Sequence, residues 1–153
     1  MARFRYRMQS ILDIKYKMEE QAKMDYATAR MRLTEEEEKK EQLKRRKQSY
    51  EEESRAALKG RLKVRKIQEA GEAILRMDEY IVQQDQEIRK AQIRLDAERE
   101  KLTELMKERK THEKLREKAF EQFLAEENAR ESKEIDELTS YTYGQKQKQN
   151  QGG

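Results

Sequence analysis

An aliphatic residue recurs at every seventh position across the middle of this chain. The series consists of Ile67, Ile74, Ile81, Ile88, Leu95 and Leu102. A strict period of seven places one apolar stripe along a helix and favours packing against a second helix with a left-handed supercoil. The companion core positions are Ala70, Met77, Gln84, Ala91, Glu98 and Leu105. Because two of these are polar, the pattern favours a seam between two helices over the core of a multi-helix domain.

The composition agrees with a long helical coiled coil rather than a globular domain. Of the 153 residues, 44% are charged and 34% are hydrophobic, and there is no Pro and no Trp. This balance is typical of coiled coils, and a disordered chain would not carry heptads. No Cys is present, which excludes disulfides and thiolate metal sites. We expect neither a membrane-spanning segment nor a signal peptide, since no apolar run is long enough.

The glycines divide the chain into two expected helices. Gly60 is the one glycine placed to turn the chain, whereas Gly71 lies within the unbroken heptads. We predict an all-α fold, a long two-stranded antiparallel coiled coil over residues 1–140. Its expected parts are a helix over 4–57, a turn over 58–63 and a second helix over 64–139. The Gln-, Lys- and Gly-rich stretch 141–153 is expected to be a disordered tail.

The first expected helix has a less regular apolar stripe than the second. Its members are Phe4, Met8, Ile11, Met18, Ala22, Tyr26, Ala29 and Leu33, followed by Leu43, Tyr50 and Ala57. The step from Met18 to Ala29 covers eleven residues, which predicts a local relaxation of the left-handed supercoil.

A turn near Gly60 sets the register of an antiparallel hairpin. Leu33 is then expected near Arg89, and Phe4 near Lys118 and Ala119. The basic start of the chain meets the acidic stretch 121–137, so the charges support this pairing. The second helix overshoots the first, and its overhang carries an apolar stripe with no expected partner in the chain. An unpaired stripe of this kind indicates a docking surface. Its members are Phe120, Phe123, Leu124, Ile135 and Leu138.

The sequence holds no recognisable catalytic arrangement. There is one His and no Cys, and no glycine-rich phosphate loop or nucleophile–base spacing is found. His112 continues the seam row from Leu105, which favours a structural histidine over a metal ligand. We therefore predict that the protein is not an enzyme and has no catalytic residue, metal or cofactor.

Two basic segments allow a functional and a structural interpretation each. The opening Phe4-Arg5-Tyr6-Arg7-Met8 could dock into an acidic partner, or it could close the seam with solvated arginines. Around the expected turn, six cations stand between Ser54 and Gln68 with no acid. These could bind nucleic acid or a membrane surface. Without interleaved aromatic residues or a recognition motif, a solvated hairpin tip is favoured.

The opening block resembles the flagellar export protein FliJ family. That family begins with alternating aromatic and basic residues, an aliphatic pair with Asp, and then Glu and Ala residues. The matching stretches here are Phe4–Asp13, Glu19–Ala22, Tyr80-Ile81 and Glu134–Glu137. The resemblance implies an antiparallel coiled coil like the central stalk of rotary ATPases, with both termini at one end. It also implies a role in bacterial flagellar type III export at the cytoplasmic face of the inner membrane.

The resemblance further implies partners and the residues that contact them. Family members dock in the pore of the hexameric export ATPase, promote its activity or assembly, link it to the membrane export gate and handle export chaperones. The implied ATPase-docking residues are Phe4, Arg5, Arg7, Met8, Ile11, Leu12, Phe120, Phe123 and Leu124. The implied gate-binding residues are Leu43, Tyr50 and Tyr80.

Three other interpretations remain open at this point. The chain could form a parallel homodimeric coiled-coil scaffold without an ATPase partner, although Gly60 weakens this. It could use its basic turn to bind nucleic acid or a membrane surface. It could also be the stalk-like protein of a virulence-type secretion system. We expect a monomeric hairpin that binds no nucleic acid.

Overall fold

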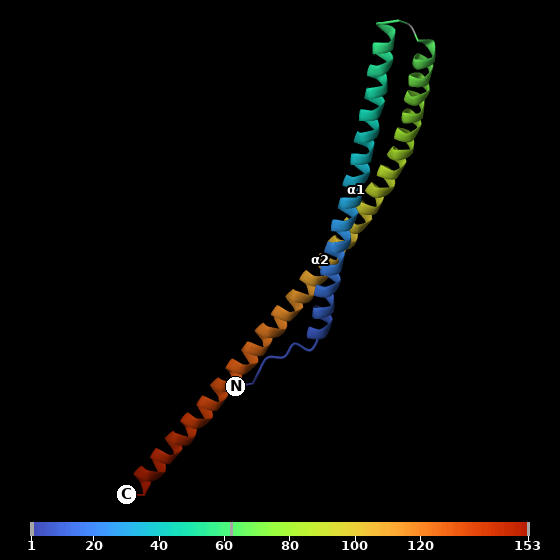
Figure 1. Ribbon diagram of the computed structural model, residues 1–153. Helices are drawn as coiled ribbons and strands as arrows, with labels where there is room; N and C mark the ends of the chain where they lie inside the picture. The colour runs from blue at the N-terminus through green and yellow to red at the C-terminus, as the bar shows by residue number, and fades with distance from the viewer. Residues whose placement is uncertain (1, 62, 153) are drawn as a thin grey trace. The chain divides into compact units, whose positions relative to one another are not determined.

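Two long helices packed against each other make up the fold, which confirms the all-α hairpin (Figure 1). The computed structural model describes residues 2–61 and 63–152. Helix α1 covers Gln9–Leu58 and helix α2 covers Val64–Gln151, so the turn lies close to its expected place, with Leu62 outside the described residues. The chain falls into two compact units, residues 18–105 and residues 1–17 with 106–153.

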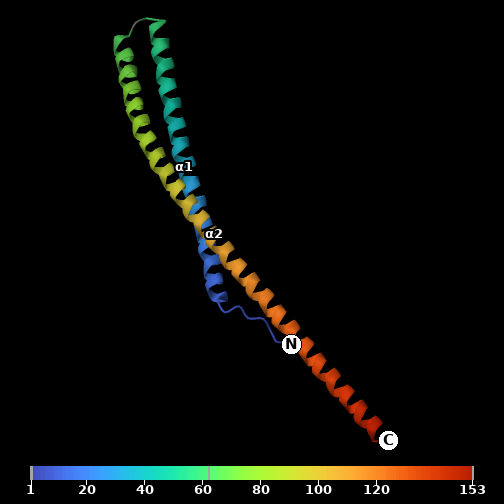
Figure 2. The same cartoon turned by 180° about the vertical axis from the view of Figure 1, so that it is seen from behind.

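In the unit formed by residues 18–105, the two helices run antiparallel on either side of the turn (Figure 2). The predicted seam of α2 is confirmed, because Ala70, Met77, Ala91 and Leu95 are all less than a tenth exposed. The register is also close to the expected one. Lys40 contacts Asp85 at 2.6 Å and Lys47 contacts Asp78 at 2.7 Å across the seam.

The seam of α1 follows strict heptads, so the predicted eleven-residue step is wrong. Met18 is 42% exposed, whereas Glu19 beside it is only 4% exposed. Ile11 is likewise exposed, and Leu12 is buried to 1%. A partner helix with a seven-residue period selects the same period on α1, even where this buries a carboxylate. Lys23, one turn further along α1, lies 3.8 Å from the Glu19 carboxylate and offsets part of that cost.

Helix α1 begins at Gln9 and not at residue 4 as predicted. Residues 2–6 have no regular structure, and a turn over residues 7–8 leads into the helix. Extending the α1 heptads backwards would place Phe4 beside the seam and not within it. The irregular path instead allows the Phe4 ring to reach two rings of α2.

The C-terminal stretch also differs from its prediction, since α2 continues to Gln151 where a disordered tail was expected from residue 141. Gln and Lys favour helices and no Pro interrupts them. One local side-chain bond adds support: Gln145 donates to the Tyr141 hydroxyl, four residues earlier, at 2.8 Å. Gly153 lies outside the described residues.

The predicted overhang of α2 is present and remains apolar on part of its surface. Ile135 and Leu138 are 62% and 65% exposed, and Tyr141 and Tyr143 are both 65% exposed. Over the described residues, neither helix contains a stretch that is long and apolar enough to cross a membrane.

Candidate docking site

An aromatic cluster joins the start of the chain to α2 within the unit of residues 1–17 and 106–153. The ring of Phe4 meets Phe120 edge-on at 5.1 Å between centroids and Phe123 at 5.4 Å. Phe120 and Phe123 lie 6.5 Å apart on one face of α2. The Arg116 guanidinium stands 5.7 Å from the Phe4 ring centre, which is cation–π range. This aromatic cluster of Phe4, Phe120 and Phe123 holds the irregular N-terminal segment against α2.

Polar contacts hold the first turns of α1 to the same part of α2. Arg116 Nε donates to Gln9 Oε1 at 3.0 Å, and Lys15 Nζ contacts Glu108 Oε2 at 2.8 Å. The Tyr16 hydroxyl donates to Glu113 Oε1 at 2.5 Å. This bond raises the pKa of Tyr16 and, together with Arg109, lowers the pKa of Glu113. These contacts make the site a packed helix pair rather than a loose chain end.

The predicted ATPase-docking residues divide into a packed group and an exposed group. Phe4, Phe120 and Phe123 come together, and Leu12 lies buried in the seam. Around them, Met8, Ile11 and Leu124 are 40%, 38% and 43% exposed. Arg5 and Arg7 are also exposed. The site therefore presents accessible apolar side chains beside cations, whereas Leu12 belongs to the buried seam.

Part of the expected unpartnered stripe does have a partner within the chain. Phe120 and Phe123 contact Phe4, whereas Ile135 and Leu138 further along α2 are largely exposed. Sequence reasoning also missed Arg116 as a member of the site. Its position one helical turn before Phe120 was the available signal, because residues four apart share a helix face.

The predicted gate-binding residues lie in two separate grooves. Leu43 and Tyr80 line one groove of about 450 Å³ together with Gln83, Gln84 and Glu87. Tyr50 instead lines a groove of about 840 Å³ next to the turn. The structure thus brings together Leu43 and Tyr80 and leaves Tyr50 apart from them.

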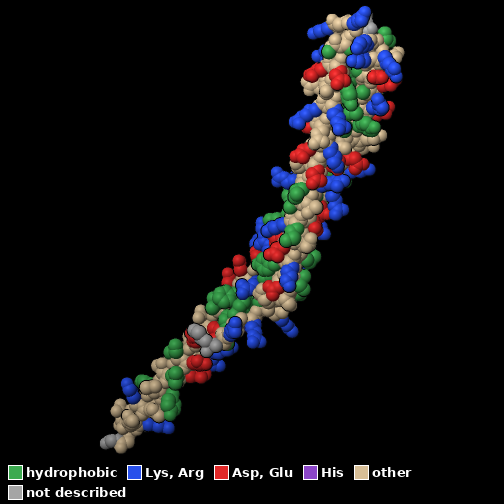
Figure 3. Space-filling model, viewed as in Figure 1, with side chains coloured by type: hydrophobic (Ala, Val, Ile, Leu, Met, Phe, Trp, Pro, Cys, Tyr) green, Lys and Arg blue, Asp and Glu red, His purple; other side chains and the backbone are tan. Residues whose placement is uncertain are grey.

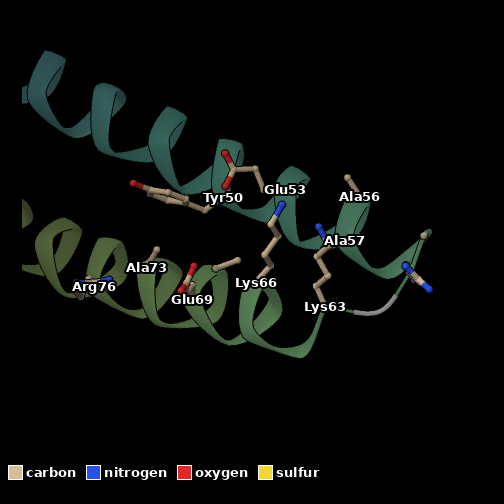
Figure 4. Close-up of a pocket in the computed structure, with 12 residues that line it drawn as sticks. Tyr50, Glu53, Ala56, Ala57, Lys63, Lys66, Glu69, Ala73 and Arg76 are labelled. Atoms are coloured by element: carbon tan, nitrogen blue, oxygen red, sulfur yellow. The ribbon is translucent and has the colours of Figure 1, made fainter.

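The groove next to the turn has small side chains inside and charged ones around it (Figure 4). Ala56, Ala57 and Ala73 leave space between the helices. Lys63, just before α2, and Lys66, in the first turn of α2, extend toward α1. Glu53 and Glu69 also line this groove, so its charge is mixed.

The single histidine occupies the predicted seam position. His112 is partly buried, and its Nδ1 has no hydrogen-bond partner among the described residues. In the part of the chain that the structure describes, no three residues of the types His, Asp and Glu lie where they could hold a metal ion.

Comparison with known protein families gives a match over most of the chain. A family model described as "Flagellar FliJ protein" matches residues 4–148, which is nearly the whole chain. No curated protein and no solved structure matches significantly.

Proposed function

Because the chain belongs to the FliJ family and is therefore a component of flagellar export, we propose that it docks in the export ATPase ring through its aromatic cluster. The docking surface comprises the cluster and the exposed Met8, Ile11 and Leu124 around it. The observation that carries this proposal is the packing of Phe4 on Phe120 and Phe123, which pre-organises an apolar anchor. Anchors of this kind with charged rims dominate binding energy in interfaces.

The proposed mechanism involves no chemistry on this chain. An asymmetric helix pair inside a six-fold ring contacts the subunits unequally. If this chain binds one nucleotide state of an ATPase subunit more tightly than another, the subunits that it contacts shift toward that state. Arg5 and Arg7, both exposed, would pair with acidic side chains of the pore. The protein would then promote turnover or assembly of the ATPase without being an enzyme.

The groove of Leu43 and Tyr80 supports a second contact within the same function. Tyr80 is 46% exposed and shares this groove with Leu43 from the opposite helix. We assign this groove to the export-gate membrane protein, with Tyr50 as a separate point of contact. Together the two surfaces would link the ATPase ring to the gate, where export chaperones deliver their cargo.

The test is ATP hydrolysis by the cognate export ATPase, titrated with this protein. Stimulation should saturate at one copy per hexameric ring and be lost in the Phe4→Ala/Met8→Asp variant. The Met24→Ala/Met31→Asp variant is the matched control, because both methionines lie on α1 away from the cluster and are 65% and 64% exposed. A Tyr80→Ala variant should keep the stimulation and lose binding to the cytoplasmic domain of the gate protein.

Two results would contradict the docking proposal. One is equal stimulation by the wild type and the Phe4→Ala/Met8→Asp variant, which would place the contact elsewhere. The other is a wild-type protein that neither stimulates the ATPase nor co-sediments with the ring. That result would favour the scaffold without an ATPase partner.

A further inference from the structure

Six exposed cations surround the turn between the helices, and we call them the basic tip. They are Arg55, Lys59, Arg61, Lys63, Arg65 and Lys66. No acidic residue occurs between Ser54 and Gln68. Arg65 pairs with Glu69 at 3.5 Å, and no ion pair to the other five is found among the described residues. Figure 3 shows Lys and Arg side chains gathered around the turn. Glu53 and Glu69 line the groove beside Lys63 and Lys66, but the turn itself, between Ser54 and Gln68, carries only positive charge that a partner can meet.

Two exposed aliphatic side chains stand among these cations. Leu58 ends α1 and is 58% exposed, and Val64 begins α2 and is 65% exposed. The two therefore flank the turn itself. A purely solvated tip has no need for apolar side chains at these positions. Aliphatic side chains next to Lys and Arg are the combination that binds the boundary between lipid headgroups and acyl chains.

A nucleic acid fits the basic tip less well than a lipid surface. Single strands bind by stacking bases on aromatic rings, and residues 54–68 contain no aromatic residue. The nearest ring, Tyr50, is partly buried in the groove between the helices. A duplex would use the cations on its phosphates but would leave Leu58 and Val64 in water.

We propose that the basic tip binds the surface of an anionic lipid bilayer. Leu58 and Val64 insert among the headgroups, and the cations lie against the lipid phosphates. This contact is independent of ATPase docking, because none of its residues belongs to the aromatic cluster or to the exposed side chains around it. It gives the hairpin a lipid attachment at its turn.

The experiment is co-sedimentation of the full chain with phosphatidylglycerol–phosphatidylcholine vesicles and with phosphatidylcholine vesicles alone. Wild-type protein should bind only the anionic vesicles. Because each cation at the surface contributes about fivefold in affinity, Lys59→Gln/Lys63→Gln should weaken binding by more than about tenfold. The matched control is Arg89→Gln/Lys101→Gln, which removes two exposed cations of the same unit. Its net charge is therefore the same as that of Lys59→Gln/Lys63→Gln. Circular dichroism checks that each variant remains helical.

A second variant tests the aliphatic contribution. Leu58→Ser/Val64→Ser keeps every charge and should weaken vesicle binding by about tenfold, as expected for apolar area lost from the interface. The Phe4→Ala/Met8→Asp variant should bind vesicles like the wild type. Failure of ATPase docking would therefore leave this result unchanged.

Three outcomes would overturn the proposal. No binding to anionic vesicles excludes it directly. If Arg89→Gln/Lys101→Gln weakened vesicle binding as much as Lys59→Gln/Lys63→Gln, the binding would depend on the net charge of the chain and not on the basic tip. Tip-dependent binding of a mixed-sequence DNA duplex, with unchanged vesicle affinity in the Leu58→Ser/Val64→Ser variant, would assign the tip to nucleic acid.

Discussion

A buried carboxylate at the seam shows how single residues set the pairing of the helices. Glu36 is only 3% exposed, and Gln84 of α2 donates to its Oε2 at 2.6 Å and to its backbone carbonyl at 2.8 Å. Arg32 and Lys39 lie 3.2 and 3.3 Å from its Oε1. The Gln84 bond, opposed by burial, lowers the pKa of Glu36. Because Gln84 is a seam position, this bond ties the two helices in one register.

Replacing the donor should therefore destabilise the protein in a pH-dependent way. Gln84→Leu should lower the free energy of unfolding by about 1–3 kcal/mol at neutral pH, since a buried carboxylate loses its donor. A carboxyl with a depressed pKa in the folded state stabilises above its unfolded pKa and loses this contribution as the pH falls through the folded value. The difference in unfolding free energy between Gln84→Leu and the wild type should therefore narrow as the pH falls below 4.5, the ordinary pKa of a Glu, toward the lowered folded pKa of Glu36.

Thermal unfolding followed by circular dichroism measures this gap. The control is Gln92→Leu, whose side chain bonds Asp96 at 3.0 Å on the exposed face of α2. It should change stability by less than about 0.5 kcal/mol at any pH. A gap between Gln84→Leu and wild type that stays constant with pH would show that the Glu36 carboxylate does not depend on Gln84.

At the scale of the element, α2 contains a glycine that its helix does not require. Gly71 lies within α2, its φ is not positive, and an added Cβ would meet nothing within 4 Å. Gly71→Ala should therefore stabilise the protein by about 0.8–1 kcal/mol, the difference in helix propensity. This raises the melting temperature by about 2–4 °C. Gly60→Ala, outside the helices, should give a smaller gain, and equal gains would contradict the helical explanation.

The two helices also differ in how well the sequence predicts them. The α2 seam is apolar at most positions, so its period identifies it. In α1 the residue types mislead, since apolar Met18 is exposed and Glu19 is buried. A carboxylate such as that of Glu19 can be recognised as a seam residue only when the seven-residue period of the partner helix is known.

The contact of Phe4 was expected in register, near Ala119. Its irregular backbone was not expected, because it depends on two rings far along the chain.

For the molecule as a whole, the charges along the α1 seam favour a hairpin over a parallel homodimer. In a parallel, in-register dimer each seam residue faces its own copy, so Lys40 would face Lys40 and Lys47 would face Lys47. Like charges facing each other destabilise a seam. In the hairpin these lysines contact Asp85 and Asp78 at 2.6 and 2.7 Å. The seam lysines of α1 therefore find opposite charges on α2, whereas a second parallel copy of α1 would face them with like charges.

Cross-linking tests this choice directly, because the chain has no Cys and the introduced thiols are then the only ones present. Lys40→Cys/Asp85→Cys, treated with a short bifunctional maleimide, should link within one chain and keep the mass near 18.5 kDa in light scattering. Lys40→Cys alone should give no linked product. In a parallel homodimer the outcome would reverse, since residue 40 would lie opposite its own copy and the single variant would link two chains. Because the single variant lacks the α2 thiol, a stoichiometric linked dimer from it would contradict the hairpin.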